Sequence, residues 1–153
     1  MHSERLSRSL ALAAAILIAA AGGAQAHSYK QKTLEIVHPW CWETSDASLS
    51  VYMVIRALTK RGDKLVAAST SIGKAELREA AMPDRSRPAA ALEVTSGKEL
   101  TLKRGEAHIL VTGVTKPFGA YDSFLMTLTF ARAGKIEVEV QVEEKNKAEP
   151  AKH

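Results

Sequence analysis

The sequence predicts a single all-β domain of the β-sandwich class. Apolar and polar residues alternate in several short segments, which is typical of half-buried antiparallel strands. Turn sequences such as KRGDK, TSGKE and KRGEA separate these segments. No long apolar stripe of helical period follows the first 26 residues. Many short, evenly spaced strands in a chain of this size indicate a Greek-key sandwich or barrel.

Nine strands are expected. Alternation is clearest at 48–58, 124–131 and 135–144, and shorter candidates lie at 33–37, 64–70, 74–81, 90–95, 99–103 and 108–114. TKPFGAYDS and AMPDRSRP are expected to be longer turns. The period of two predicts which side chains face the core, namely Val51, Met53, Phe124, Met126, Leu128, Ile136, Val138 and Val140.

Residues 1–26 are expected to be a cleaved secretory signal. Arg5 and Arg8 precede an apolar segment too short to span a bilayer, and Ala24-Gln25-Ala26 matches a peptidase site. The mature chain would begin at His27, with one domain over 27–143 and a disordered tail over 144–153. No cysteine stands at the cleavage point, so a periplasmic protein without a membrane anchor is expected.

Charge and cysteine content narrow the possible functions. Removing Arg5, Arg8 and Glu4 from the totals of 21 basic and 17 acidic residues leaves a mature charge of +3. The basic residues are scattered, so a nucleic-acid partner is not expected. Cys41 is the only cysteine, which excludes an internal disulfide and leaves a buried thiol, a metal ligand or an intermolecular bridge.

Enzymatic motifs are missing from the sequence, whereas metal binding stays open. There is no G-x-S-x-G elbow and no glycine-rich phosphate loop, so an enzyme is not expected. Cu(I) prefers sulfur and imidazole, and methionine is a durable donor in an oxidising compartment. His108 and residue 110 would share one face of a strand, but residue 110 is leucine.

The mature chain resembles the periplasmic copper chaperones called PCu(A)C. The similar segments are HSYK, LEIVHPWCW, YMVI, GDKLVAASTS, KAELREAAM, ALEVTSGKELTLKRGEAHILVTGVTKPF and FLMTLTFARAGKIEVEV. The resemblance implies a cupredoxin-like β-sandwich, a monomer, and a role in carrying Cu(I) to a partner such as a cytochrome oxidase assembly factor.

The family's ligand signature, H-x10-M-x21-H-x-M, is mostly replaced in this chain. Its first histidine falls on Arg78, its first methionine near Ser86, and its closing pair on His108 and Leu110. The resemblance therefore implies one retained ligand, His108, on the same face as Leu110 and close to the 78–86 connection. Met82 is the sulfur expected to join His108.

Two hypotheses follow from these residues. In the first, the protein binds or delivers Cu(I) through His108 and Met82, or alternatively through the amine and imidazole of His27. In the second, it is a metal-free β-sandwich that binds a protein partner, with Arg78 as a contact. His38 and Cys41 are interpreted as structural in both.

Overall fold

The computed structural model describes residues 28–31, 33–82 and 85–145. Within these ranges no helical segment has the length and hydropathy to cross a membrane. Eleven strands run through the described residues: β1 (Ser28–Gln31), β2 (Leu34–Trp42), β3 (Ser48–Ala57), β4 (Asp63–Thr70), β5 (Lys74–Met82), β6 (Arg85–Pro88), β7 (Leu92–Val94), β8 (Leu100–Leu102), β9 (His108–Thr112), β10 (Ser123–Phe130) and β11 (Gly134–Glu143).

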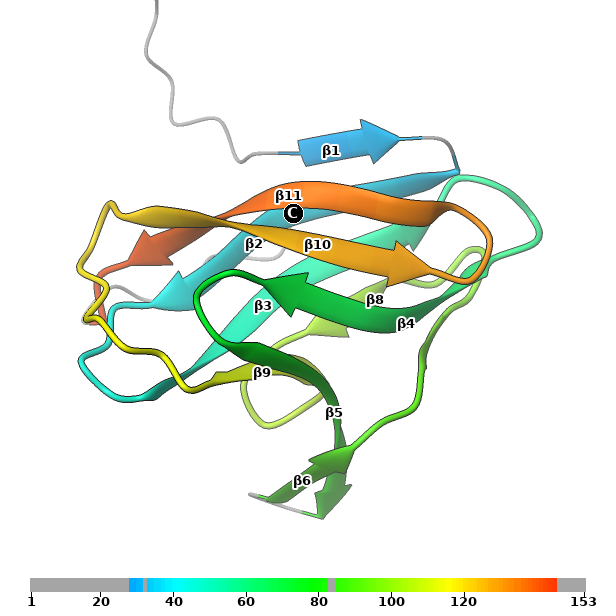
Figure 1. Cartoon of the computed structure of the whole chain (residues 1–153). Coiled ribbons are helices and arrows are strands. Elements are labelled where there is room, and N and C mark those ends of the chain that lie inside the picture. The colour runs from blue at the N-terminus through cyan, green and yellow to red at the C-terminus, as the bar shows by residue number, and fades with distance from the viewer. Residues whose placement is uncertain (1–27, 32, 83–84, 146–153) are drawn as a thin grey trace, which may run out of the picture.

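The strands form one mixed sheet that folds over itself. Its order is β6-β5-β9-β3-β2-β11-β10-β4-β7, with β1 added to β2 and β8 added to β3. Every pair is antiparallel except β2 with β11, which run parallel over Trp40–Trp42 and Gln141–Glu143. In Figure 1, β11, β10 and β4 lie in front of β2, β3 and β8. The last strand of the path, β7, contacts β3 and β8, so the two layers enclose one core.

The core confirms the predicted strand faces. All eight residues expected to face inward are buried: Val51, Met53, Phe124, Met126, Leu128, Ile136, Val138 and Val140. The glutamates between them on β11 point to the other side, because successive side chains of a strand alternate. The predicted all-β, single-domain fold class is therefore confirmed.

Strands β1 and β6 were not predicted, and neither was the second half of β2. β1 and β6 are mostly exposed and show no apolar alternation, so they give no periodic signal. β6 lies within the segment expected to be a turn, and it ends at Pro88, which suits an edge strand. β2 continues five residues beyond the predicted end, through a bulge at His38 and Pro39.

A buried carboxylate joins the start of β4 to the turn between β10 and β11. Asp63 is 5% exposed and accepts backbone hydrogen bonds from Lys64 (2.8 Å), Arg132 (2.9 Å) and Ala133 (3.0 Å). Gly62 precedes it with φ of +63°, and a Cβ there would lie 2.6 Å from the Val94 carbonyl oxygen. Glycine is therefore required at position 62.

β1 and β11 share one edge of β2. β1 pairs with β2 as far as Val37, which stands opposite Ser28. From Trp40 onward, β2 pairs with β11 instead. The Tyr29 hydroxyl accepts a hydrogen bond from the Glu139 backbone N–H at 3.0 Å, which fixes β1 against β11. The bulge at His38 and Pro39 lies where one neighbour replaces the other. The predicted leader and His27, and the predicted tail beyond Lys145, lie outside the described residues.

Candidate metal site

His108 begins β9, as predicted, and a hydrogen bond fixes its imidazole. Its Nδ1 lies 2.9 Å from the carbonyl oxygen of Glu106. A carbonyl oxygen can only accept, so Nδ1 carries the proton and Nε2 keeps its lone pair in the neutral ring. The preceding turn is closed by the Glu106 N–H donating to the Lys103 carbonyl at 3.0 Å. This is the orientation that a histidine ligand needs.

The predicted convergence of His108 with the 78–86 segment is confirmed. Arg78 of β5 is the direct strand partner of His108, and Glu76 is the partner of Leu110. Ile109 and Val111 point into the core, so His108 and Leu110 share the opposite, half-buried face. The family's four ligand positions therefore lie on or beside one hairpin, although most of the donors are gone.

Arg78 and Ser86 bind each other. Arg78 Nε donates to the Ser86 hydroxyl at 3.1 Å, and Nη2 donates to the Ser86 carbonyl oxygen at 2.8 Å. Its Nη1 also lies 3.5 Å from a carboxylate oxygen of Glu76, and the Arg78 side chain is 19% exposed. A cross-strand polar network thus occupies two of the four positions where the family has soft donors.

The described residues do not form a four-donor copper site. His108 offers one nitrogen donor, and Leu110 offers no donor atom. The Ser86 hydroxyl accepts a hydrogen bond from the Arg78 guanidinium. Among the described residues, no three His, Cys, Asp or Glu side chains are arranged to hold a metal. Met82 pairs with Arg85 through the backbone, and its side chain is outside the described part of the chain. Its role as a ligand stays a prediction.

Aromatic residues next to His108 were missed by sequence reasoning. The rings of His108 and Tyr52 lie 6.5 Å apart, Tyr52 lies 5.0 Å from Trp40, and Trp40 lies 4.7 Å from Trp42. Tyr52 and Trp40 are buried although they lie on the outer face of the sheet. In the sequence, Tyr52 and Trp40 alternate with residues that face the core, and this alternation could have placed both rings on the outer face of the sheet.

The surroundings of Cys41 do not favour metal binding. The thiol is completely buried within the core. Burial, and to a smaller extent the charge of Glu143, raise the pKa of Cys41 to about 12. Because the thiolate is the metal-binding form, this cysteine behaves as a small apolar residue near neutral pH. The interpretation of Cys41 as structural agrees with its surroundings.

His38, which was interpreted as structural, has an unusual backbone conformation and a close contact with a carboxylate. Its backbone φ is +48°, a left-handed conformation that is uncommon for residues other than glycine, although histidine adopts it more often than most. Nε2 lies 2.7 Å from a Glu143 carboxylate oxygen. Nevertheless, neither buried ring nitrogen makes a hydrogen bond of acceptable geometry with a described residue. The contact is therefore close but poorly directed.

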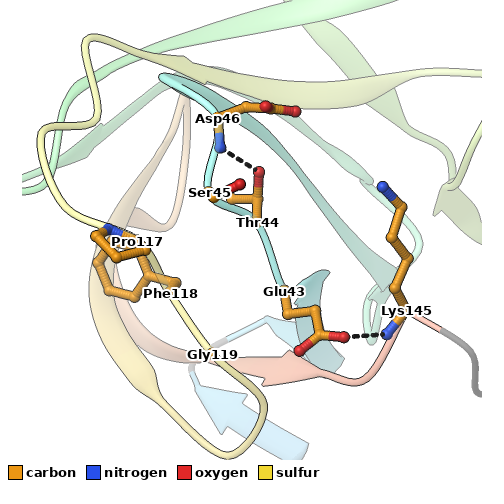
Figure 2. A pocket seen from close by; sticks show the side chains of 8 residues that line it. All are labelled: Glu43, Thr44, Ser45, Asp46, Pro117, Phe118, Gly119 and Lys145. Carbon is orange, nitrogen blue, oxygen red and sulfur yellow. Dashed lines mark hydrogen bonds between the residues drawn. The ribbon is translucent and has the colours of Figure 1, made fainter.

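An open groove of about 410 Å³ lies at one end of the domain (Figure 2). Its lining comes from residues 43–46, from 117–119 and from Lys145. Backbone hydrogen bonds between Thr44 and Phe118 join the two loops, and the Lys145 N–H donates to Glu43. No residue predicted as a ligand lines this groove, so it is separate from the candidate metal site.

The comparisons with known proteins agree with this architecture. A family model described as "Putative lipoprotein LpqE-like" matches residues 34–142. Among the curated proteins, none matches the chain.

Solved structures show the same fold. A copper-bound PCuAC domain from PmoF2 is 21% identical, with a TM-score of 0.68, and the match covers 77% of this chain and 98% of that domain. The apo PCuAC domain from PmoF1 is 24% identical, with a TM-score of 0.69 and coverage of 77% and 99%. Cu(I)-DR1885 from Deinococcus radiodurans is 19% identical, with a TM-score of 0.61 and coverage of 85% and 89%. The family match and this shared fold lead to one conclusion: the chain belongs to the LpqE-like family, whose fold is that of PCuAC domains.

Proposed function

We propose that this protein is an exported copper-handling protein that binds Cu(I) through His108, with Met82 as the second donor. The observation that carries the proposal is the Nδ1 contact with Glu106, which leaves Nε2 free to donate on the half-exposed face of β9. Two of the solved structures that share the fold, the PCuAC domain from PmoF2 and Cu(I)-DR1885, are copper-bound. A cytochrome oxidase assembly factor is the proposed receiver, and we expect no catalytic reaction.

Export through a cleaved leader and a periplasmic location belong to the same proposal. The lipoprotein description of the family supports export. Cys41 is buried within β2, and we propose a mature form in which this thiol is not lipidated. We further propose that the mature protein is monomeric.

Affinity for Cu(I) should be low compared with that of a site with four soft donors. Two unlike donors cannot match two imidazoles and two thioethers, because soft ligands select Cu(I). A fixed positive charge 4 Å from a bound cation would cost about 4 kcal/mol at an effective dielectric of about 20. Glu76, 3.5 Å from Arg78, offsets part of this repulsion. The missing donors are therefore expected to weaken binding more than the charge does.

The test is competition of the mature protein against a Cu(I) chelator. His108→Ala should abolish binding and Met82→Leu should weaken it, whereas Thr112→Ala, an exposed change on the same strand, should leave it unchanged. Binding by the unmodified protein that His108→Ala does not alter would contradict the proposal.

A second function is favoured by the network of Arg78, Ser86 and Glu76. These three residues satisfy one another and need no metal. A metal-free β-sandwich that binds a protein partner, with Arg78 as a contact, would leave this network intact. No detectable Cu(I) binding by the unmodified mature protein would favour this function over copper handling.

A further inference from the structure

We propose that one end of the domain binds peripherally to an anionic phospholipid surface. This basic end consists of residues 58–62, 95–98 and 131–135. The proposal goes beyond copper handling and does not depend on metal binding by His108. It needs no covalent anchor, because side chains make the contact.

The fold gathers basic residues that are scattered in the sequence. The Asp63 carboxylate accepts hydrogen bonds from the backbone of Arg132 and Ala133, which ties the β10–β11 turn to the start of β4. A Cβ on Gly62 would lie 3.5 Å from the Ser96 nitrogen, so the loop after β7 packs against the same place. Figure 1 shows the β3–β4 and β10–β11 connections at the same end of the domain. The exposed basic residues of this end are Lys60, Arg61, Lys98, Arg132 and Lys135.

The positive charge of the basic end is not neutralised within the described part of the chain. None of its five exposed basic residues forms an ion pair with another described residue. The acidic side chains of the adjoining strands have other partners. Glu35 and Glu99 lie 3.3 Å and 2.7 Å from Arg56, and Glu93 lies 3.3 Å from Lys64. The basic end can therefore attract an external anion.

The opposite end of the domain carries acidic residues, namely Glu43, Asp46, Asp122, Glu143 and Glu144. β11 has 10 residues and runs from one end to the other, which separates the two ends by about 30 Å. Exposed charges are screened beyond about 8 Å at physiological ionic strength, so the acidic end does not cancel the basic one. An anionic surface attracts one end and repels the other, and this asymmetry orients the domain.

Leu58 distinguishes a membrane from other anionic partners. Its side chain is 51% exposed, and it lies in the same loop as Lys60 and Arg61. A membrane interface accommodates both kinds of side chain, because it combines anionic headgroups with an apolar interior that leucine can enter. A nucleic acid would satisfy the charges and leave Leu58 without an apolar layer. The combination therefore favours a phospholipid surface.

The experiment is co-sedimentation of the full chain, expressed with its leader and purified after export, with phospholipid vesicles. One set of vesicles contains phosphatidylcholine alone, and the other contains equal amounts of phosphatidylcholine and phosphatidylglycerol. Binding should require phosphatidylglycerol and should weaken as salt is added, because salt screens exposed charges. Each basic residue near an anionic leaflet strengthens binding about fivefold, so Lys60→Glu combined with Arg61→Glu should weaken it at least about 25-fold.

Lys74→Glu combined with Lys116→Glu is the matched control. It changes the net charge equally, but both lysines are exposed at the opposite end, so vesicle binding should be unchanged. Leu58→Ser should weaken binding by about fivefold and leave its dependence on salt unaltered.

Three results would overturn the proposal. Equal binding to both kinds of vesicle would show that anionic lipid is not recognised. Equal losses in the two charge-reversed pairs would show that net charge, and not the basic end, determines binding. Unchanged binding in Leu58→Ser would remove the argument for a membrane and favour a soluble anionic partner.

Discussion

Replacing Asp63 should destabilise the domain more than any other single exposed or buried polar change that we propose. The carboxylate accepts three backbone hydrogen bonds of 2.8–3.0 Å, one of them fully buried. In Asp63→Ala, the two part-buried N–H groups can turn to water at a cost of about 1 kcal/mol each, and the buried one loses about 2 kcal/mol. The sum, about 4 kcal/mol, is a large part of the total stability of a typical domain.

The assay is thermal and urea unfolding of the mature protein. For a domain of this size, about 4 kcal/mol corresponds to a decrease of about 12 to 20 °C in Tm. Asp122→Ala is the matched control, since that exposed carboxylate accepts one backbone hydrogen bond, from Gly119 at 2.8 Å. It should lower the stability by about 1 kcal/mol or less. Equal effects of the two variants would refute the argument that burial and the number of accepted bonds determine the cost.

The remaining predictions concern other parts of the chain. Arg78→His combined with Leu110→Met should raise Cu(I) affinity by orders of magnitude in chelator competition, because it restores two soft donors and removes a positive charge; unchanged affinity would contradict the placement of the site. Cys41 should react with a thiol reagent at pH 8 only after unfolding, because burial raises its pKa from 9.0 to about 12. The free energy of unfolding should accordingly fall as the pH rises from about 9 to 12, since the unfolded chain loses the thiol proton first, and this component should be missing in Cys41→Ala. Tyr29→Phe should cost about 1 kcal/mol in urea unfolding through the lost contact with the Glu139 N–H, and no change would show that β1 is held by its pairing with β2 alone.

Periodicity predicted the parts of the fold that have one polar and one apolar face. β10 and β11 could be assigned residue by residue, because every second side chain enters the core. β1 and β6 could not be assigned in this way, because backbone pairing with a neighbouring strand holds them in place and their own side chains are mostly exposed. β2 continues past Pro39 only through a bulge. A proline in the sequence argues against an uninterrupted strand, and the bulge could not be predicted from it.

The candidate sites divide in the same way. His108 and its neighbourhood followed from a motif whose members lie on two paired strands. The contact between His38 and Glu143 joins residues near the two ends of the domain, and no spacing rule connects them. A lone histidine before a proline carries no local signal of its partner. The partner becomes visible only when the pairing of β2 with β11 is known.

The parallel join between β2 and β11 also governs how the domain can fold. It pairs Trp40–Trp42 with Gln141–Glu143, almost the whole domain apart in sequence, and it links the two halves of the strand path. Pairing between such distant segments slows folding. The chain loses the conformational entropy of a long loop before the new contacts can stabilise it. The chain can therefore complete its core only after β11 has been synthesised and released. The export proposed above is compatible with this order of events, because a chain whose last strand has not yet paired is still unfolded enough to be translocated.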